Sequence, residues 1–241
     1  MSRQGNETLK PESWAWHLMG LINPILVILC NLEGDWWGFG GLVFVLGVGP
    51  FLDFALGKAR TPRPPRASGL PFEILLYVHA VLQFIALAAL FYRAGIERNA
   101  WTSWIAALST GLTSGVSGII VAHELGHKRP GSSGWWIGRL NLLSVLYLHF
   151  TTEHNYTHHK LVATSEDPAT AFFGESLWAF ILRTIPSQYL DAISIHERKG
   201  KKALKNPVIQ GSIIQVTLLA VSYTHLRAHE TPEHRVFPDN G

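Results

Sequence analysis

The chain has 241 residues, of which 47% are hydrophobic and only 15% are charged, with a formal net charge of +3. An ordinary soluble domain is about 25% charged, so this composition is typical of a membrane protein. The single cysteine, Cys30, lies inside an apolar run, which excludes a disulfide framework and a thiolate metal site. The basic residues lie beside apolar runs, so the positive charge indicates membrane topology and not a nucleic-acid partner.

Four apolar segments are long enough to cross a bilayer, which takes about 20 helical residues. We predict these spans at Trp14–Leu32, Trp36–Leu56, Leu70–Tyr92 and Ala100–Ala122. The basic, proline-rich loop at 57–69 is predicted to lie in the cytoplasm, because lysine and arginine accumulate on that side of a membrane. A fifth apolar run, Val208–Val221, has 14 residues and is predicted to be too short to span. The fold class is therefore all-α, a polytopic transmembrane helical bundle with four complete spans and a truncated fifth.

Asp53 and His79 are two of the ionisable residues within these spans. Asp53 is near the end of the second span, and His79 is inside the third. Asp53 is either an interfacial carboxylate that needs no partner or a carboxylate that orients a metal-bound histidine. An ionisable residue within the membrane suggests function, yet a single histidine such as His79 is more often a hydrogen-bonded interior residue than a ligand.

A first histidine box, His123-Glu-Leu-Gly-His127-Lys128, follows the fourth span. Counting spans from a cytoplasmic N-terminus returns the chain to the cytoplasm at this box. The helix of the fourth span is predicted to continue through the box, which places His123 and His127 on one face, one turn apart. Glu124 and Lys128 can pair at the same spacing. The box also fits the His-Glu-x-x-His pattern of zinc proteases, which by itself discriminates weakly.

A second histidine box, Glu153-His154-Asn-Tyr-Thr-His158-His159, lies about thirty residues further on. We predict one long helix over Trp135–Thr164, apolar early and polar late, with His154 and His158 on one face and His159 one step round. Five imidazoles exceed one tetrahedral zinc site, which argues against a protease. All-nitrogen ligation suits iron, copper or zinc, and an open coordination position suits oxygen chemistry at iron. The two boxes are predicted to surround two metal ions.

Other polar residues near the boxes have supporting roles in this prediction. His149 is off the face of His154 and is interpreted as structural or supporting rather than as a ligand. Glu153 is a candidate acceptor for an imidazole N–H, and Asp167 either does the same or caps the turn after the helix. The alternative is a histidine-rich interfacial helix that titrates or binds lipid headgroups.

At these residues the sequence resembles the membrane-bound alkane 1-monooxygenases, which belong to the integral-membrane non-haem di-iron hydroxylases and desaturases. The resemblance rests on the two boxes, with weaker support from Gly-Pro-Phe-Leu-Asp at 49–53, and covers Trp14 to Ala220. The Glu-His-Asn-x-x-His-His form favours the alkane and xylene branch over a desaturase. Thr157 stands where that family usually has glycine.

The resemblance implies a bundle of six transmembrane helices with a di-iron site at its cytoplasmic end, in the bacterial inner membrane. The metal ligands on this chain would be the five box histidines, His123, His127, His154, His158 and His159. Four further residues would orient these ligands without binding the metal themselves: Glu124, Glu153, Asp53 and His149. The family hydroxylates the terminal methyl of medium- or long-chain alkanes that enter from the lipid phase, with oxygen and with electrons from rubredoxin.

The sequence departs from the family after residue 221. The family completes its site with four further histidines in Asn-Tyr-x-x-His-Tyr-Gly and Gln-Arg-His-Ser-Asp-His-His motifs, and neither occurs in this sequence. His225, His229 and His234 match neither motif, and Pro232 interrupts any helix that would align them. We expect 1–221 to be the N-terminal part of an alkane hydroxylase domain and 222–241 to be a non-native tail, so that this chain alone holds an incomplete iron site and is inactive.

Two alternatives remain open. One is a xylene-type or fatty-acyl hydroxylase or desaturase of the same superfamily, which the boxes do not distinguish. The other is a membrane protein that binds a metal without catalysis and would consume no oxygen.

Overall fold

The structure, a computed structural model, describes residues 11, 13–57, 63–64, 66–97 and 100–228. Every regular element within these ranges is helical, which confirms the all-α prediction. The chain divides into two compact units, Met1–Asn141 and Leu142–Gly241. The first histidine box belongs to the first unit and the second box to the second unit.

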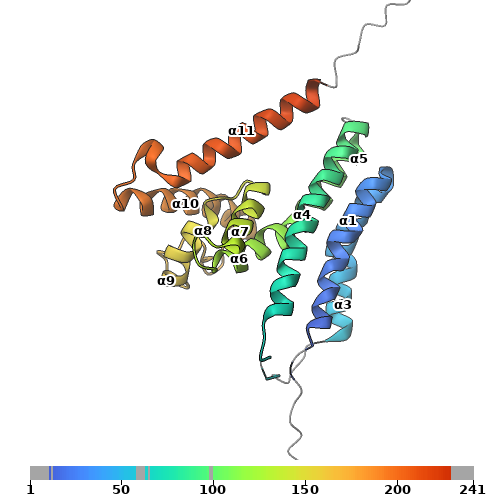
Figure 1. Cartoon of the computed structure of the whole chain (residues 1–241), viewed down its shortest axis with the longest axis horizontal. Coiled ribbons are helices and arrows are strands. Elements are labelled where there is room, and N and C mark those ends of the chain that lie inside the picture. The colour runs from blue at the N-terminus through green and yellow to red at the C-terminus, as the bar shows by residue number, and fades with distance from the viewer. Residues whose placement is uncertain (1–10, 12, 58–62, 65, 98–99, 229–241) are drawn as a thin grey trace, which may run out of the picture. The chain divides into compact units, whose positions relative to one another are not determined.

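The first unit contains long apolar helices (Figure 1). Its elements are a 3-10 helix (Trp14–Leu21), α1 (Ile22–Glu33), a 3-10 helix (Asp35–Phe39), α2 (Gly40–Val43), a π-helix (Phe44–Val48), α3 (Gly49–Leu56), α4 (Leu70–Glu97), α5 (Trp101–Ser114), a π-helix (Gly115–Ile120), α6 (Val121–Gly126) and α7 (Ser133–Ser144), whose last residues enter the second unit. Four continuous helical segments are long and apolar enough to cross a membrane: Trp14–Glu33, Asp35–Leu56, Leu70–Glu97 and Trp101–Gly126. These four confirm the predicted spans.

The first unit buries polar side chains and exposes apolar ones, as expected for helices surrounded by lipid. Asn31 Nδ2 donates to Thr110 Oγ1 at 3.0 Å, and Asn23 Nδ2 donates to Thr113 Oγ1 at 3.1 Å, both inside the bundle. These bonds join α1 to α5. Gly41 lets the second span pack closely against α1 and α5, because a Cβ atom at this position would collide with the Val27 and Ser109 side chains.

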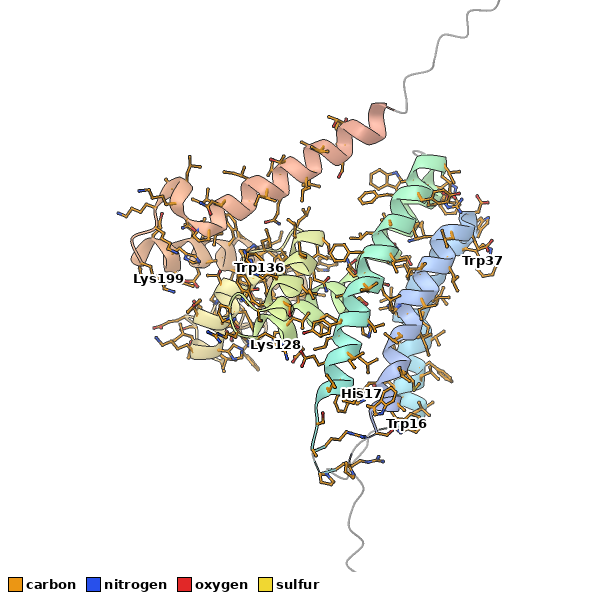
Figure 2. The ribbon with its side chains drawn as sticks, viewed as in Figure 1. Trp16, His17, Trp37, Lys128, Trp136 and Lys199 are labelled. Atoms are coloured by element: carbon orange, nitrogen blue, oxygen red, sulfur yellow. The ribbon has the colours of Figure 1, made fainter. Side chains whose placement is uncertain are left out.

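Exposed tryptophans lie at both ends of the first two spans. Trp16 and Trp37 are 67% and 62% exposed and lie at opposite ends of this helix pair (Figure 2). Tryptophan favours the two membrane–water interfaces because its ring is apolar and its N–H can bond to water or headgroups. The two tryptophans therefore agree with a membrane–water interface at each end of this helix pair.

The second unit consists of shorter helices followed by a helical hairpin (Figure 1). Its elements are α8 (Phe150–Glu153), a π-helix (His154–His158), α9 (His159–Leu161), α10 (Leu177–Arg198), a 3-10 helix (Ala203–Lys205) and α11 (Pro207–Ala228). Tyr189 Oη and Ser212 Oγ are 2.9 Å apart and link α10 to α11. Asn206 caps α11, since its Oδ1 accepts from Val208 N at 3.0 Å, with a proline at the first helical position.

Two of the predicted elements are wrong. The single helix over Trp135–Thr164 does not exist: α7 ends at Ser144, and Leu146 adopts φ 57° before α8 begins. Tyr147 N donates to Leu142 O at 2.8 Å, which closes the turn. Periodicity cannot detect this break, because apolar residues continue through it.

The fifth apolar run is also longer than predicted. Pro207–Thr224 has 18 residues and is long and apolar enough to cross a membrane, within the part of the chain that the structure describes. The helix continues through Ser222–Thr224. Thr224 Oγ1 donates to Val221 O at 2.9 Å.

Candidate metal centre

The first histidine box lies at the end of the fourth span. His123 is in α6 and His127 is the residue that caps it, with ring centroids 4.9 Å apart and perpendicular planes. One ring nitrogen of each lies within 4.8 Å of the other. Two nitrogens bound to one metal at about 2.1 Å lie at most about 4.2 Å apart, so a small side-chain rotation would bring both onto one ion. The prediction that these two histidines share a face is confirmed.

Glu124 bonds to His123, the residue that precedes it. His123 Nδ1 lies 3.0 Å from Glu124 Oε1, so the ring proton is on Nδ1 and the metal-binding lone pair is on Nε2. The expected pair between Glu124 and Lys128 does not form. Lys128 Nζ instead lies 2.8 Å from Glu73 Oε2, and its pKa is raised chiefly by this hydrogen bond. The reason is that α6 ends at Gly126, so Lys128 has left the helical position that would face Glu124.

The second histidine box is wound as a π-helix over His154–His158. A π-turn closes with i to i+5 hydrogen bonds, so it brings residues five apart together. Accordingly the His154 ring lies 4.5 Å from that of His159 and 5.2 Å from that of His158. One ring nitrogen of His154 and one of His159 lie within 4.8 Å of each other. The predicted α-helical pairing of His154 with His158 is thus replaced by a closer pair with His159.

Asp167 holds the remaining histidine of this box. Its fully buried carboxylate accepts a hydrogen bond from His158 Nδ1 at 2.9 Å. Burial alone would raise the pKa of Asp167, but hydrogen bonds from Thr170, Ala169 and His158 outweigh burial and lower it. The His158 proton is therefore on Nδ1, and its Nε2 carries the lone pair, the arrangement that supports metal-bound imidazoles in many proteins. The sequence left the role of Asp167 open between this bond and a turn cap.

Glu153 does not accept an imidazole N–H, the role expected of it. It is fully buried, and neither carboxylate oxygen has a hydrogen-bond partner among the described residues. Burial, with the nearby charges of Asp167 and Asp191, raises the pKa of Glu153 to about 7. A buried carboxylate without partners is unfavourable unless a proton or a cation compensates it. A proton on Glu153 or a cation beside it would relieve this unfavourable charge.

His149 and His79 pack inside the fold, and the Asp53 side chain has no polar contact with a described residue. The buried His149 ring packs between Tyr147 and Tyr189, with ring centroids 4.4 and 5.3 Å away, and burial lowers its pKa to about 4. His79 Nδ1 lies 3.1 Å from Ser117 Oγ inside the helix bundle. Asp53 is exposed near the end of α3, and its side chain forms no hydrogen bond or ion pair with a described residue.

Residues 99–229, which include both boxes, match the sequence profile of the family described as fatty acid desaturase. The chain belongs to the fatty acid desaturase family. The part of this desaturase-family chain that the structure describes has five helices able to cross a membrane, and the chain is a multi-pass membrane protein. Histidines of its boxes could hold a metal ion, and an all-imidazole donor set suits iron.

Curated relatives of this desaturase-family chain include several alkane 1-monooxygenases. The one from Ectopseudomonas oleovorans is 32% identical over 89% of this chain and 57% of the relative. The one from Pseudomonas putida is 32% identical over 95% of this chain and 59% of the relative. Alkane 1-monooxygenase 1 from Alcanivorax borkumensis is 32% identical over 90% of this chain and 57% of the relative. The chain thus spans somewhat more than half the length of these relatives.

Proposed function

We propose that the protein to which this chain belongs is a membrane di-iron monooxygenase that hydroxylates the terminal methyl of medium- or long-chain alkanes. In this proposal oxygen is the co-substrate, rubredoxin delivers the electrons, and the alkane enters from the lipid phase. The proposal extends to location: the protein lies in the bacterial inner membrane, with both histidine boxes on the cytoplasmic side. The basic segments at 58–66 and 198–205 support that orientation, because such residues remain cytoplasmic.

One observation carries the proposal, namely five imidazoles in two boxes on a chain related to alkane 1-monooxygenases along most of its length. The pairs His123–His127 and His154–His159 each hold ring nitrogens within 4.8 Å, which supports binding of each pair to a common ion. His158, oriented by Asp167, is the fifth proposed ligand. Two iron ions would account for all five.

The proposed substrate explains why the protein would need a metal. An alkane has no polar group for a nucleophile or base to attack, and bound iron supplies the oxidising power that its C–H bond requires. The chain's own residues would orient the ligands. Glu124 and Asp167 bond to Nδ1 of His123 and His158, which would leave both Nε2 atoms as lone-pair donors for a metal.

The test is an assay on the product of the full coding sequence that contains this chain. Membranes supplied with reduced rubredoxin, oxygen and octane are expected to form 1-octanol, and purified protein is expected to contain two irons. His158→Ala should abolish both. A preference for xylenes or fatty-acyl chains would reassign the substrate. Metal binding without oxygen consumption would refute catalysis. A single bound zinc, together with a peptidase activity that Glu124→Gln abolishes, would refute the monooxygenase.

A further inference from the structure

Helix α10 exposes large apolar side chains on one side and buries two polar side chains on the other. Trp178, Leu182 and Leu190 are 75%, 78% and 63% exposed. Thr184 and Gln188 face the interior of the second unit, where Gln188 Nε2 donates to Thr184 Oγ1 at 2.8 Å. A helix in contact with water would have the opposite arrangement. The exposed side of α10 is therefore covered by lipid or by an apolar protein surface.

This exposed side continues into the turn before α10. Phe173 is fully exposed, and we call Phe173, Trp178, Leu182 and Leu190 together the α10 ridge. The turn is held in place by Arg183, whose guanidinium bonds to Glu175 Oε1 at 2.7 Å and lies 4.1 Å from the centre of the Phe172 ring. The ridge is thus a fixed feature of the second unit.

The α10 helix is amphipathic rather than transmembrane. It carries Arg183 and Asp191 in its central part and is not among the helices apolar enough to cross a bilayer in the described chain. A helix with a strong apolar side and a polar side lies along the membrane surface, with its apolar side about 5–10 Å into the boundary between headgroups and acyl chains. The aromatic rings of Phe173 and Trp178 suit that depth.

A cluster of exposed basic residues follows α10 directly. We call this cluster the basic turn, and it consists of Arg198, Lys199, Lys201, Lys202 and Lys205. The spanning segment Pro207–Thr224 begins two residues later, so the basic turn must lie at a bilayer surface. Figures 1 and 2 show this connection between α10 and α11, with Lys199 labelled. Clusters of four to eight lysines and arginines beside a transmembrane helix bind anionic lipid headgroups.

We infer that α10 lies in the plane of an anionic membrane surface, with the α10 ridge among the lipid chains and the basic turn on acidic phospholipid headgroups. The link between Tyr189 and Ser212, 2.9 Å, supports this position. It joins the middle of α10 to a point five residues into the spanning segment, about 7.5 Å along its axis. Lipid, rather than a protein partner, is the occupant because the apolar ridge and the basic turn adjoin a spanning helix. The inference does not depend on the metal or on the proposed reaction.

The test measures the depth of the ridge in nanodiscs that contain the whole chain. Cys30 is replaced by serine, and a spin label is attached at Leu182→Cys, at Leu190→Cys or at the exposed control Ser165→Cys. In discs rich in phosphatidylglycerol, both ridge labels should collide with oxygen more than with a water-soluble nickel chelate, at a depth of about 5–10 Å below the phosphates. The Ser165→Cys label should collide mainly with the chelate.

A charge variant tests the role of the headgroups. Lys201, Lys202 and Lys205 are changed together to glutamine, which leaves the contact of Lys199 with the Tyr156 ring, 3.8 Å, intact. Each lysine near an anionic surface favours the bound state about fivefold. The Leu182→Cys label should therefore be shallower than in the unchanged chain in phosphatidylglycerol discs, and equal to it in discs of phosphatidylcholine alone. Ridge labels that meet the chelate freely, or that are shielded from both reagents by protein, would overturn the inference, as would equal depths in anionic discs.

Discussion

Replacing Asp167 by asparagine should weaken metal binding at the second histidine box while leaving its size unchanged. The carboxylate is fully buried and accepts a charge-assisted hydrogen bond from His158 Nδ1 at 2.9 Å. Hydrogen bonds to charged groups contribute about 1.5–3 kcal/mol. An amide has a weaker acceptor oxygen and can also donate to the imidazole, which favours the tautomer with its proton on Nε2.

The expected loss of metal affinity is about 10- to 100-fold, the range found when a carboxylate behind a metal-bound histidine is removed. It corresponds to about 1.4–2.7 kcal/mol. The assay is competition between purified protein and a chelator, with retained iron measured at each chelator concentration. Glu166→Gln is the matched control, because it makes the same type of change at the exposed neighbouring position.

A second measurement separates the effect of Asp167 on the orientation of His158 from its effect on the stability of the fold. Asp167 also accepts from Thr170 Oγ1 at 2.5 Å and from Ala169 N at 2.9 Å, so its replacement should lower the melting temperature as well. Thr170→Val removes part of this turn network and keeps the bond to His158. We expect Thr170→Val to lower the melting temperature and to retain iron affinity. The reasoning is refuted if Asp167→Asn binds iron as tightly as Glu166→Gln does.

Three further predictions concern stability. The hydrogen bond from Arg183 holds the pKa of Glu175 at about 2, below its ordinary value. The stabilisation of the second unit by this ion pair is therefore complete above the ordinary carboxyl pKa and is lost as the pH falls toward 2. Thermal melts followed by circular dichroism should show Glu175→Gln to be less stable than the unchanged chain at pH 6, and the difference should vanish near pH 2. Gly41→Ala should destabilise the first unit by about 1–3 kcal/mol in a detergent melt because of the collision described above, whereas Gly47→Ala meets nothing within 4 Å and should be neutral. Asn206→Ala should cost about 1–2 kcal/mol through loss of the α11 cap, and equal stability of the variant and the unchanged chain would contradict that role.

The transmembrane helices were the most predictable part of the fold. Hydropathy is summed over a whole span, and a chain in lipid must satisfy its backbone hydrogen bonds within the helix, so composition nearly determines the element. The spans were therefore correct to within a few residues at most ends. The predicted fifth span is too short because it ends before the polar residues Ser222 and Thr224, which the observed helix includes.

The second unit was less predictable because local exceptions determine it. Nothing in the residue pattern near Leu146 marks a left-handed backbone, since glycine is the usual residue there. Asp167 follows the box by several residues, and only the folded turn shows which histidine it bonds. The pairing of Glu73 with Lys128 likewise joins segments far apart in sequence, which periodicity does not detect.

The π-turn changes what the second histidine box can do. On an α-helix, His154 and His158 would form the pair and His159 would point elsewhere. On the π-turn, His154 lies closest to His159, and His158, whose ring is 5.2 Å from that of His154, bonds to the Asp167 carboxylate. Three imidazoles on six consecutive residues therefore have two different environments, a neighbouring pair and a single carboxylate-supported ring. The proposed centre with two ions would use ligands directed to different metals from one short segment, and this division provides them.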